Sequence, residues 1–271
     1  MDRVLDFHTA KAMLEWQIEL GATEAIGETP VDRYAAAADP APAAPAPGKP
    51  PQAAVAAAAA APAADPAPAG ADAVEAARSA AAEAHSLEGL RYALSSFAHC
   101  ELKKGARNTV FSDGNPEARV MIVGEAPGRD EDIEGKSFVG RAGKLLDRMF
   151  DAIGLARAGS GAAALYITNV MPWRPPQNRD PTPEEIAMML PFVERHVELV
   201  APDILVLMGN TACQALLGRK GITRLRGHWA EVLGRPALPM FHPAYLLRNP
   251  AAKREAWHDL LMIRHRLEEE G

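Results

Sequence analysis

Short apolar runs alternate with helical patterns along the chain after residue 119, and this alternation predicts the fold. The runs that read as parallel strands are 120–123, 165–171, 204–208 and 237–241, with a weaker strand near 229–233. Strands separated by helices favour a parallel sheet with right-handed crossovers and helices on both faces. We therefore predict an α/β protein, a three-layer α/β/α fold with a central, mostly parallel four-stranded sheet.

Helical patterns precede and separate these runs. Leu87, Leu90, Leu94 and Phe97 are spaced three or four residues apart, and Ser86 is placed to cap the helix that they predict. Further helices are expected at about 71–84, 184–200 and 251–269, and through 212–217.

The first 70 residues differ in composition from the rest. Residues 35–70 are almost wholly alanine and proline, so they lack the large side chains that build a core. We predict an N-terminal helix and extension over 1–34, a disordered linker over 35–70, and a folded domain over 71–271. Residues 10–20, with Trp16, form an apolar stripe. That segment either docks on the domain, docks on a partner, or is a partly formed helix with no partner.

Charge and cysteine content set few limits. The 271-residue chain has a formal net charge of −6, but residues 1–85 carry 12 acidic and 5 basic side chains, so the remainder is nearly neutral. This balance neither supports nor excludes a nucleic-acid partner. No apolar run of membrane-spanning length and no secretory signal is visible. Cys100 and Cys213 give no disulfide framework, so we expect a cytoplasmic location.

The stretch 120–147 contains a glycine-bearing loop between a strand and a helix. Its apolar run ends at Gly124-Glu125-Ala126-Pro127-Gly128, an acidic loop follows, and a helical pattern begins before Leu145. Ligands of open α/β sheets bind just past the carboxyl ends of such strands. Alone, the stretch is equally consistent with an ordinary turn and a solvated acidic loop.

Three polar residues, far apart in sequence, each lie at or near the end of a predicted parallel strand. They are Glu125, Asn169 and His242. Because parallel strands end at the same edge of a sheet, we expect these side chains to share one cleft. Each residue alone is weak evidence, since a lone histidine is more often structural and an asparagine after a strand is usually a turn residue.

Three ordered motifs resemble the family 4 uracil-DNA glycosylases, over about residues 95–268. The first motif is the loop 124–128, followed by Glu131-Asp132 and by Phe-Val-Gly-Arg-Ala-Gly at 138–143. The second is Asn169-Val170, followed by Arg-Pro-Pro-Gln-Asn-Arg at 174–179. The third is His-Pro-Ala-Tyr-Leu-Leu-Arg-Asn-Pro at 242–250. The resemblance implies a monofunctional enzyme, a monomer, that hydrolyses the N-glycosidic bond of uracil in DNA for base excision repair. Its partner would be uracil-containing DNA, in the nucleoid if the protein is bacterial.

The resemblance also implies roles for pocket residues. A base must leave the DNA stack to be excised, so a pocket has to receive it. Phe138 resembles the aromatic residue that stacks on uracil, although core packing is its plain alternative. Asn169 resembles the uracil reader, because a carboxamide offers both a donor and an acceptor to O4 and N3–H. His242 is expected to donate to uracil O2 as negative charge develops there.

A carboxylate is expected to orient the attacking water. The candidates are Glu125, Glu131 and Asp132. The resemblance favours Glu125 and Glu131 as catalytic residues over Asp132, and it places Asp132 with Gly124, Ala126 and Pro127 among the substrate-binding residues. The third position of the first motif, aspartate in the main uracil-excising family, is Ala126 here. A solvated loop or a helix N-terminal charge pairing is the alternative for Glu131 and Asp132.

DNA contacts are expected from two loops. Leu246 and Leu247 follow His242-Pro243 in an otherwise polar segment, and apolar side chains there are suited to wedge into a duplex. Arg179 and Arg248 are expected to meet phosphates. The alternative is a loop at the start of a helix whose leucines pack inward.

The chain departs from the family at the iron–sulfur cluster. In register with the four cysteines that typically hold it, this chain has Phe97, Cys100, Trp173 and Met189. One thiolate remains where a cluster normally needs four ligands, and Cys213 lies in the wrong part of the sequence. We expect no cluster, no other metal and no cofactor, with apolar side chains in its place.

Two alternatives to an active glycosylase stay open. One is a non-catalytic uracil-DNA binder with the same fold, against which the presence of Glu125, Phe138, Asn169 and His242 argues. The other is a relative that becomes covalently attached to DNA through a histidine-containing loop after the second strand. Residues 173–183 contain no histidine, which argues against that reading.

Overall fold

The computed structural model describes residues 71–269. The helix predicted over 10–20, the extension over 1–34 and the linker over 35–70 lie outside the described residues. The domain predicted from residue 71 onward is described up to Glu269.

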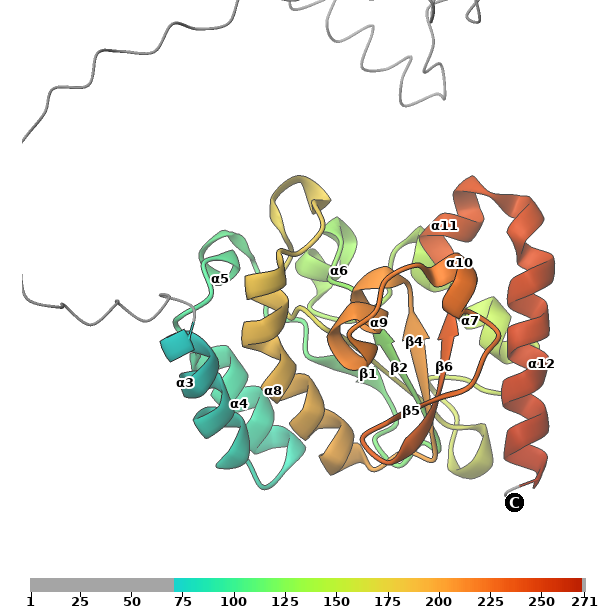
Figure 1. The fold of residues 1–271 in the computed structure, drawn as a ribbon, viewed down its shortest axis with the longest axis horizontal. Helices are drawn as coiled ribbons and strands as arrows, with labels where there is room; N and C mark the ends of the chain where they lie inside the picture. The colour runs from blue at the N-terminus through green and yellow to red at the C-terminus, as the bar shows by residue number, and fades with distance from the viewer. Residues whose placement is uncertain (1–70, 270–271) are drawn as a thin grey trace, which may run out of the picture. The chain divides into compact units, whose positions relative to one another are not determined.

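A six-stranded sheet runs through the centre of the domain (Figure 1). The strands are β1 Ser112–Gly114, β2 Val120–Gly124, β3 Leu165–Asn169, β4 Ile204–Met208, β5 Ala230–Val232 and β6 Arg235–Met240. Their order is β1-β3-β2-β4-β6-β5, and the four inner strands are parallel. The predicted four-stranded core is therefore present, but antiparallel β1 and β5 extend it at both edges. β5 corresponds to the weaker strand predicted near 229–233, whereas β1 was not predicted, because its three residues are too few to give a clear sequence pattern.

The inner strands are buried on both faces, which explains their continuous apolar runs. Because side chains alternate along a strand, Met121 and Val123 face one side of the sheet, whereas Val120 and Ile122 face the other. Every residue of β2, β3 and β4 is buried.

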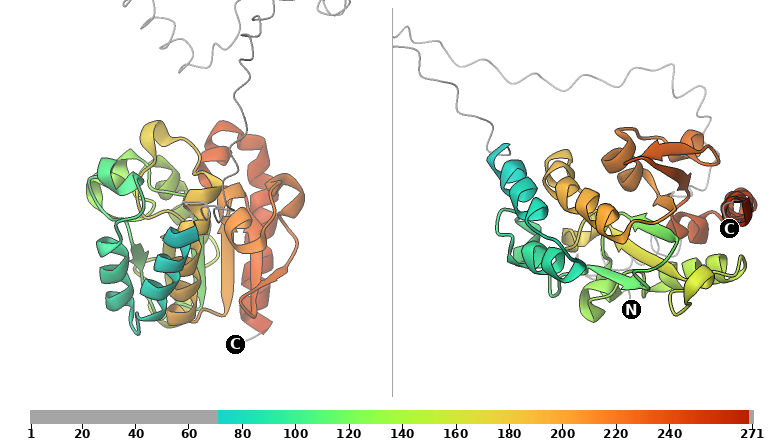
Figure 2. Two further views of the ribbon diagram at one scale, coloured as in Figure 1. Left: turned by 60° about the vertical axis from the view of Figure 1, so that its left-hand side comes forward. Right: turned by 90° about the horizontal axis from the view of Figure 1, so that it is seen from below.

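Helices cover both faces of the sheet, as the prediction required. The helices are α3 Ala71–Ala82, α4 Leu87–Ser96, α5 Leu102–Gly105, α6 Arg129–Glu134, α7 Arg141–Asp151, α8 Pro183–Val200, α9 Asn210–Leu217, α10 Ile222–Leu225, α11 Pro243–Arg248 and α12 Lys253–Glu269. Short 3₁₀ turns occur at Gly161–Ala163, Pro176–Asn178 and Pro250–Ala252. α3, α4 and α8 lie on one side of the sheet and α7 and α12 on the other, and the layers are also separate in the rotated views (Figure 2).

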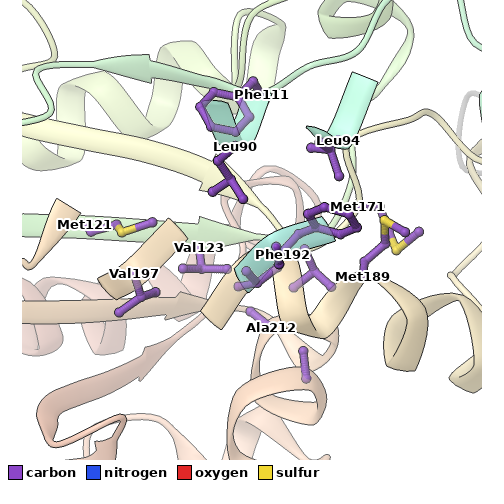
Figure 3. Packing of buried hydrophobic residues seen from close by; sticks show 14 of the residues in the cluster. Leu90, Leu94, Phe111, Met121, Val123, Met171, Met189, Phe192, Val197 and Ala212 are labelled. Carbon is purple, nitrogen blue, oxygen red and sulfur yellow. The ribbon is translucent and has the colours of Figure 1, made fainter. Parts of the chain in front are cut away.

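The larger core lies between the sheet and the α3, α4, α8 layer. Figure 3 shows Leu90 and Leu94 of α4, Phe192 of α8 and Val123 of β2 in this cluster. Burying such a side chain is worth about 1.5–3 kcal/mol, so this layer is a main source of stability.

Local signals explain where two helices begin. Ser86 Oγ accepts a hydrogen bond from Gly89 N at 3.1 Å, which confirms the predicted cap of α4. Thr182 and Glu185 form a reciprocal capping box at the start of α8, with Pro183 in its first turn.

Two segments predicted as loops are helical instead. The acidic segment after Gly128 forms α6, because its carboxylates lie in the first turn, where the helix dipole favours negative charge. The segment after His242 forms α11, with Pro243 in its first turn. Among the described residues, no helix is long and apolar enough to cross a membrane.

Candidate active site

The carboxyl ends of three parallel strands, β2, β3 and β6, bring the predicted polar residues together. A cleft of about 460 Å³ is lined by residues from the ends of β2, β3 and β6 and from the loops that follow them. Its lining includes nine of the predicted site residues: Glu125, Ala126, Pro127, Glu131, Phe138, Asn169, Arg179, His242 and Arg248. The convergence inferred from strand order is therefore present in the fold.

Backbone pairing holds Glu125 beside Asn169. Beyond the end of β3, Val170 N donates to Gly124 O at 3.0 Å and Met171 N donates to Glu125 O at 2.9 Å. The two strands therefore stay in register past their last ladder residues, and this fixes the two side chains at one edge of the sheet.

Gly124 forms the floor beneath two cleft residues. A Cβ at Gly124 would overlap Asn169 Oδ1 and the ring of Phe138. Glycine is required here for close approach rather than for its backbone conformation. Gly124 thus serves the site without lining the cleft.

Asn169 presents an unpaired acceptor. The residue is 7% exposed, and its Oδ1 is buried without a hydrogen-bond partner. An unsatisfied buried polar atom costs about 1–3 kcal/mol, so such an atom at a cleft indicates a ligand group that donates to it.

Phe138 is held in an unusual backbone conformation. Its φ is +55°, in the left-handed region that a bulky residue rarely adopts. Such a conformation costs on the order of 1–3 kcal/mol and persists where the surroundings enforce it. The ring lies with its centroid 5.3 Å from that of the His242 ring, so the two rings line one part of the cleft.

His242 is a neutral donor aimed from the start of α11. Its Nδ1 accepts a hydrogen bond from Ala244 N at 3.2 Å, which leaves the proton on Nε2. Burial, with a smaller contribution from Arg248, lowers the pKa of His242 to about 4. The imidazole is therefore uncharged at neutral pH, with one N–H available to a ligand.

Glu125 is a partly buried carboxylate with one side-chain partner. Thr211 Oγ1 donates to Glu125 Oε2 at 2.8 Å. Burial raises the pKa of the Glu125 carboxyl, the Thr211 hydrogen bond opposes that rise, and the charge of Asp180 adds to it. A carboxylate with a raised pKa is suited to accept a proton during a reaction.

Glu131 lines the same cleft, but both of its oxygens are occupied. Oε2 accepts from Gly128 N at 3.1 Å and Oε1 accepts from Gly140 N at 2.9 Å. It therefore joins the loop after β2 to the loop before α7, and Glu125 is the freer of the two carboxylates.

Comparison with known proteins assigns the chain to a family. The sequence profile of the uracil DNA glycosylase superfamily matches residues 111–261, more than half of the chain. The chain belongs to this superfamily. It is 39% identical to a type-4 uracil-DNA glycosylase of Archaeoglobus fulgidus over 187 residues, which cover 66% of this chain and 92% of that protein. It is 42% identical to a Thermotoga maritima type-4 enzyme over 153 residues, 55% of this chain and 77% of that protein. A type-5 enzyme of Pyrobaculum aerophilum is 30% identical over 150 residues, covering 50% and 66%.

Two of the predicted residues that do not line the cleft, Asp132 and Leu246, are buried elsewhere. Asp132 is buried, and its Oδ1 accepts from Arg107 N at 2.8 Å and Asn108 N at 3.2 Å, so it anchors a neighbouring loop rather than binding substrate. Leu246 is fully buried in a cluster with Phe241 and Ala256. The prediction that Leu246 wedges into DNA is therefore wrong, because the helical turn of α11 directs it inward.

The remaining DNA-contact predictions fall on accessible side chains. Leu247 is 37% exposed and Arg248 is exposed, both on α11. Arg179 lies at the cleft but pairs with Glu185 at 2.6 Å. A phosphate bound by Arg179 would therefore share the guanidinium of that arginine with the carboxylate of Glu185.

Sequence reasoning missed Thr211, which lies three residues past the end of β4. The rule that found Asn169 and His242 applies to β4 as well, but Thr211 belongs to a helical pattern and reads as an ordinary helix residue. Only its hydrogen bond to Glu125 distinguishes it.

The four positions at which the resemblance leads us to expect cluster cysteines lie together in the larger core. Phe97, Cys100, Trp173 and Met189 are all buried in that cluster. Trp173 Nε1 donates to Thr109 Oγ1 at 3.0 Å, so its polar atom is satisfied. Within the described part of the chain, no group of three or more histidine, cysteine, aspartate or glutamate side chains is arranged to hold a metal. This donor set does not fit a four-ligand cluster.

Proposed function

We propose that this protein is a monofunctional uracil-DNA glycosylase that hydrolyses the N-glycosidic bond of a uracil extruded from DNA. The observation that carries the proposal is the unpaired Oδ1 of Asn169, buried in a cleft that also holds an aromatic ring, a neutral histidine and a carboxylate. The names of the relatives support the same reaction.

Recognition follows from the edge pattern of the base. Asn169 Oδ1 accepts from uracil N3–H while its amide nitrogen donates to O4, and cytosine offers the opposite pattern at both atoms. Phe138 supports the face of the flipped base. The absence of a side chain at Gly124 lets the carboxamide of Asn169 and the ring of Phe138 both lie close to the backbone there, at the same part of the cleft.

Cleavage of the glycosidic bond places negative charge on the uracil base, next to the hydrogen-bond donor of His242. The C1′–N1 bond breaks, its electron pair leaves with the base, and negative charge reaches O2. The low pKa of His242 keeps its imidazole neutral. The Nε2–H of the neutral ring donates a hydrogen bond to that oxygen and stabilises the anion without giving up its proton. The interaction strengthens in the transition state, so it acts on the chemical step.

Hydrolysis is completed by water. Glu125 orients a water molecule toward C1′, its negative charge stabilises the positive charge on the sugar, and its oxygen accepts a proton as the new C–O bond forms. Thr211 holds the other side of that carboxylate. Leu247 and Arg248, exposed on α11 next to His242, would meet the DNA around the extruded nucleotide.

The function is tested with uracil-containing DNA followed by alkaline cleavage of abasic sites. We expect a strand break at the uracil position, and His242→Ala should lower the single-turnover rate by roughly 10²–10³, the scale of one such donor. His258→Ala is the control, since that histidine is exposed on α12. Intact DNA after incubation with the folded wild-type protein would reject the proposal.

The enzyme is also proposed to work without an iron–sulfur cluster. Burial raises the pKa of the Cys100 thiol, which disfavours the thiolate that a cluster binds. Purified protein should be colourless, and Cys100→Ser should remain folded and active. About four irons per chain, the content of a cubane cluster, would contradict this.

A further inference from the structure

The loop that carries Phe138 is fixed by an arginine that no sequence motif singles out. Arg157 lies after α7, and its side chain is 19% exposed. Its Nη1 donates to Ser137 O at 2.8 Å and its Nη2 donates to Phe138 O at 2.9 Å. The two carbonyls belong to the residue in the left-handed conformation and to the residue before it.

The other N–H groups of Arg157 bind carboxylates of two separate elements. Nη1 donates to Asp113 Oδ2 of β1 at 2.8 Å. Asp147 Oδ1 of α7 lies 2.9 Å from Nε and 2.7 Å from Nη2. A guanidinium has five N–H donors in a rigid planar fork, and these contacts account for all five. The arginine therefore ties the Phe138 loop to a strand and to a helix at once.

The first turn of α7 presses on the same carbonyl. A Cβ at Gly143 would overlap Phe138 O and its carbonyl carbon. Phe138 O is thus enclosed between the helix backbone and the guanidinium. With the carbonyl held on both sides, the φ of Phe138 is enforced and its ring is directed toward Gly124 and His242.

We propose that Arg157 is a positioning residue that holds the Phe138 ring in its base-stacking orientation and thereby sets the affinity of the cleft for an extruded uracil. The inference rests on the proposed function for its ligand. Its effect on substrate passes through Phe138, since Arg157 is absent from the lining of the cleft. A lysine keeps the charge but not the planar fork, so it is the substitution that isolates the geometry.

A double-mutant cycle separates positioning from general stability. Arg157→Lys should weaken inhibition by free uracil and lower the single-turnover rate, each by about tenfold. In a Phe138→Ala background, the same change should have less than about a twofold effect on the rate. Arg119→Lys is the matched control, because Arg119 is 27% exposed, pairs with Asp203 and precedes β2 at the other end of the sheet. Equal fold-changes in both backgrounds would overturn the positioning role.

A measurement without DNA keeps the two proposals apart. Amide hydrogen exchange at residues 137–140 should be faster in Arg157→Lys than in the wild type or Arg119→Lys. If the wild type excises no uracil, the proposed function fails, whereas the exchange result still decides whether Arg157 holds the loop. If Arg157→Lys does not fold, Asp147→Asn removes one carboxylate partner and keeps the arginine. Unchanged exchange in these variants would reject the inference.

Discussion

The hydroxyl of Thr211 donates a 2.8 Å hydrogen bond to Glu125 Oε2 and so joins the helix after β4 to the strand end of β2. Burial raises the pKa of Glu125, and the hydrogen bond from Thr211 opposes that rise, so it lowers the pH above which the group is a carboxylate.

Thr211→Val should therefore impair excision most in acid. Loss of the bond raises the pKa of Glu125 further, so the acid limb of the pH–rate profile should move to higher pH. The single-turnover rate at neutral pH should fall by about tenfold, equivalent to about 1.4 kcal/mol. Thr211→Ser keeps the hydroxyl and should restore both values. An unchanged pH–rate profile in Thr211→Val would show that Thr211 has no effect on the carboxylate of Glu125 during excision.

Two histidines of low pKa predict that the fold weakens in acid. Burial lowers the pKa of His196 to about 3 and, together with the charge of Arg248, that of His242 to about 4. An unfolded histidine titrates near 6.5, so between these values the unfolded state binds more protons than the folded state. The free energy of unfolding should be fully present above pH 6.5 and fall by at least about 3 kcal/mol toward pH 4.

Urea unfolding at pH 7 and pH 4.5 measures this dependence. His196→Gln keeps a neutral polar group near Tyr166, whose hydroxyl lies 2.9 Å from His196 Nε2, and it should reduce the pH dependence. The same loss of stability in both proteins would show that other groups are responsible.

Asn169→Asp tests how the base is read. The change replaces the amide donor by an acceptor, so O4 of uracil loses its partner while the fold keeps a side chain of similar volume. Uracil excision should fall by roughly 10- to 100-fold, the cost of leaving one buried polar group unpaired. Thermal melting on the same preparation shows whether the loss is structural. Full activity in a folded variant would show that Asn169 does not read the uracil edge.

The adjacent leucines of α11 form a matched pair for DNA contact. Leu247 is 37% exposed, whereas Leu246 is fully buried. Leu247→Ala should leave the melting temperature unchanged and slow excision from double-stranded DNA more than from single-stranded DNA, because only a duplex must be opened. Leu246→Ala should cost about 2–5 kcal/mol of stability. An equal fold-reduction in rate on both DNA forms for Leu247→Ala, relative to the wild type, would reject a wedge.

The sequence predicted the parallel core and its cleft because both follow from local rules. Long apolar runs located β2, β3, β4 and β6, and the common edge of a parallel sheet placed Glu125, Asn169 and His242 together. The edge strand β5 matches the weaker strand predicted near 229–233, whereas β1 escaped prediction because its three residues carry no period. The inward direction of Leu246 depends on the helical turn of α11, and the binding of Asp132 to Arg107 and Asn108 depends on a contact across 24 or more positions. Neither has a local pattern.

The double attachment of Glu131 has a consequence for how DNA meets this protein. Its carboxylate closes the segment from Gly128 to Gly140 into a ring, with α6 inside it. This segment, 128–140, forms a rim of the cleft, and its conformational entropy is therefore lost when the chain folds and not when a nucleotide binds. A rim that is already ordered costs a ligand less to bind. The cleft is expected to receive a base with little rearrangement, so the slow step of entry would lie in the DNA, where the base must leave its stack.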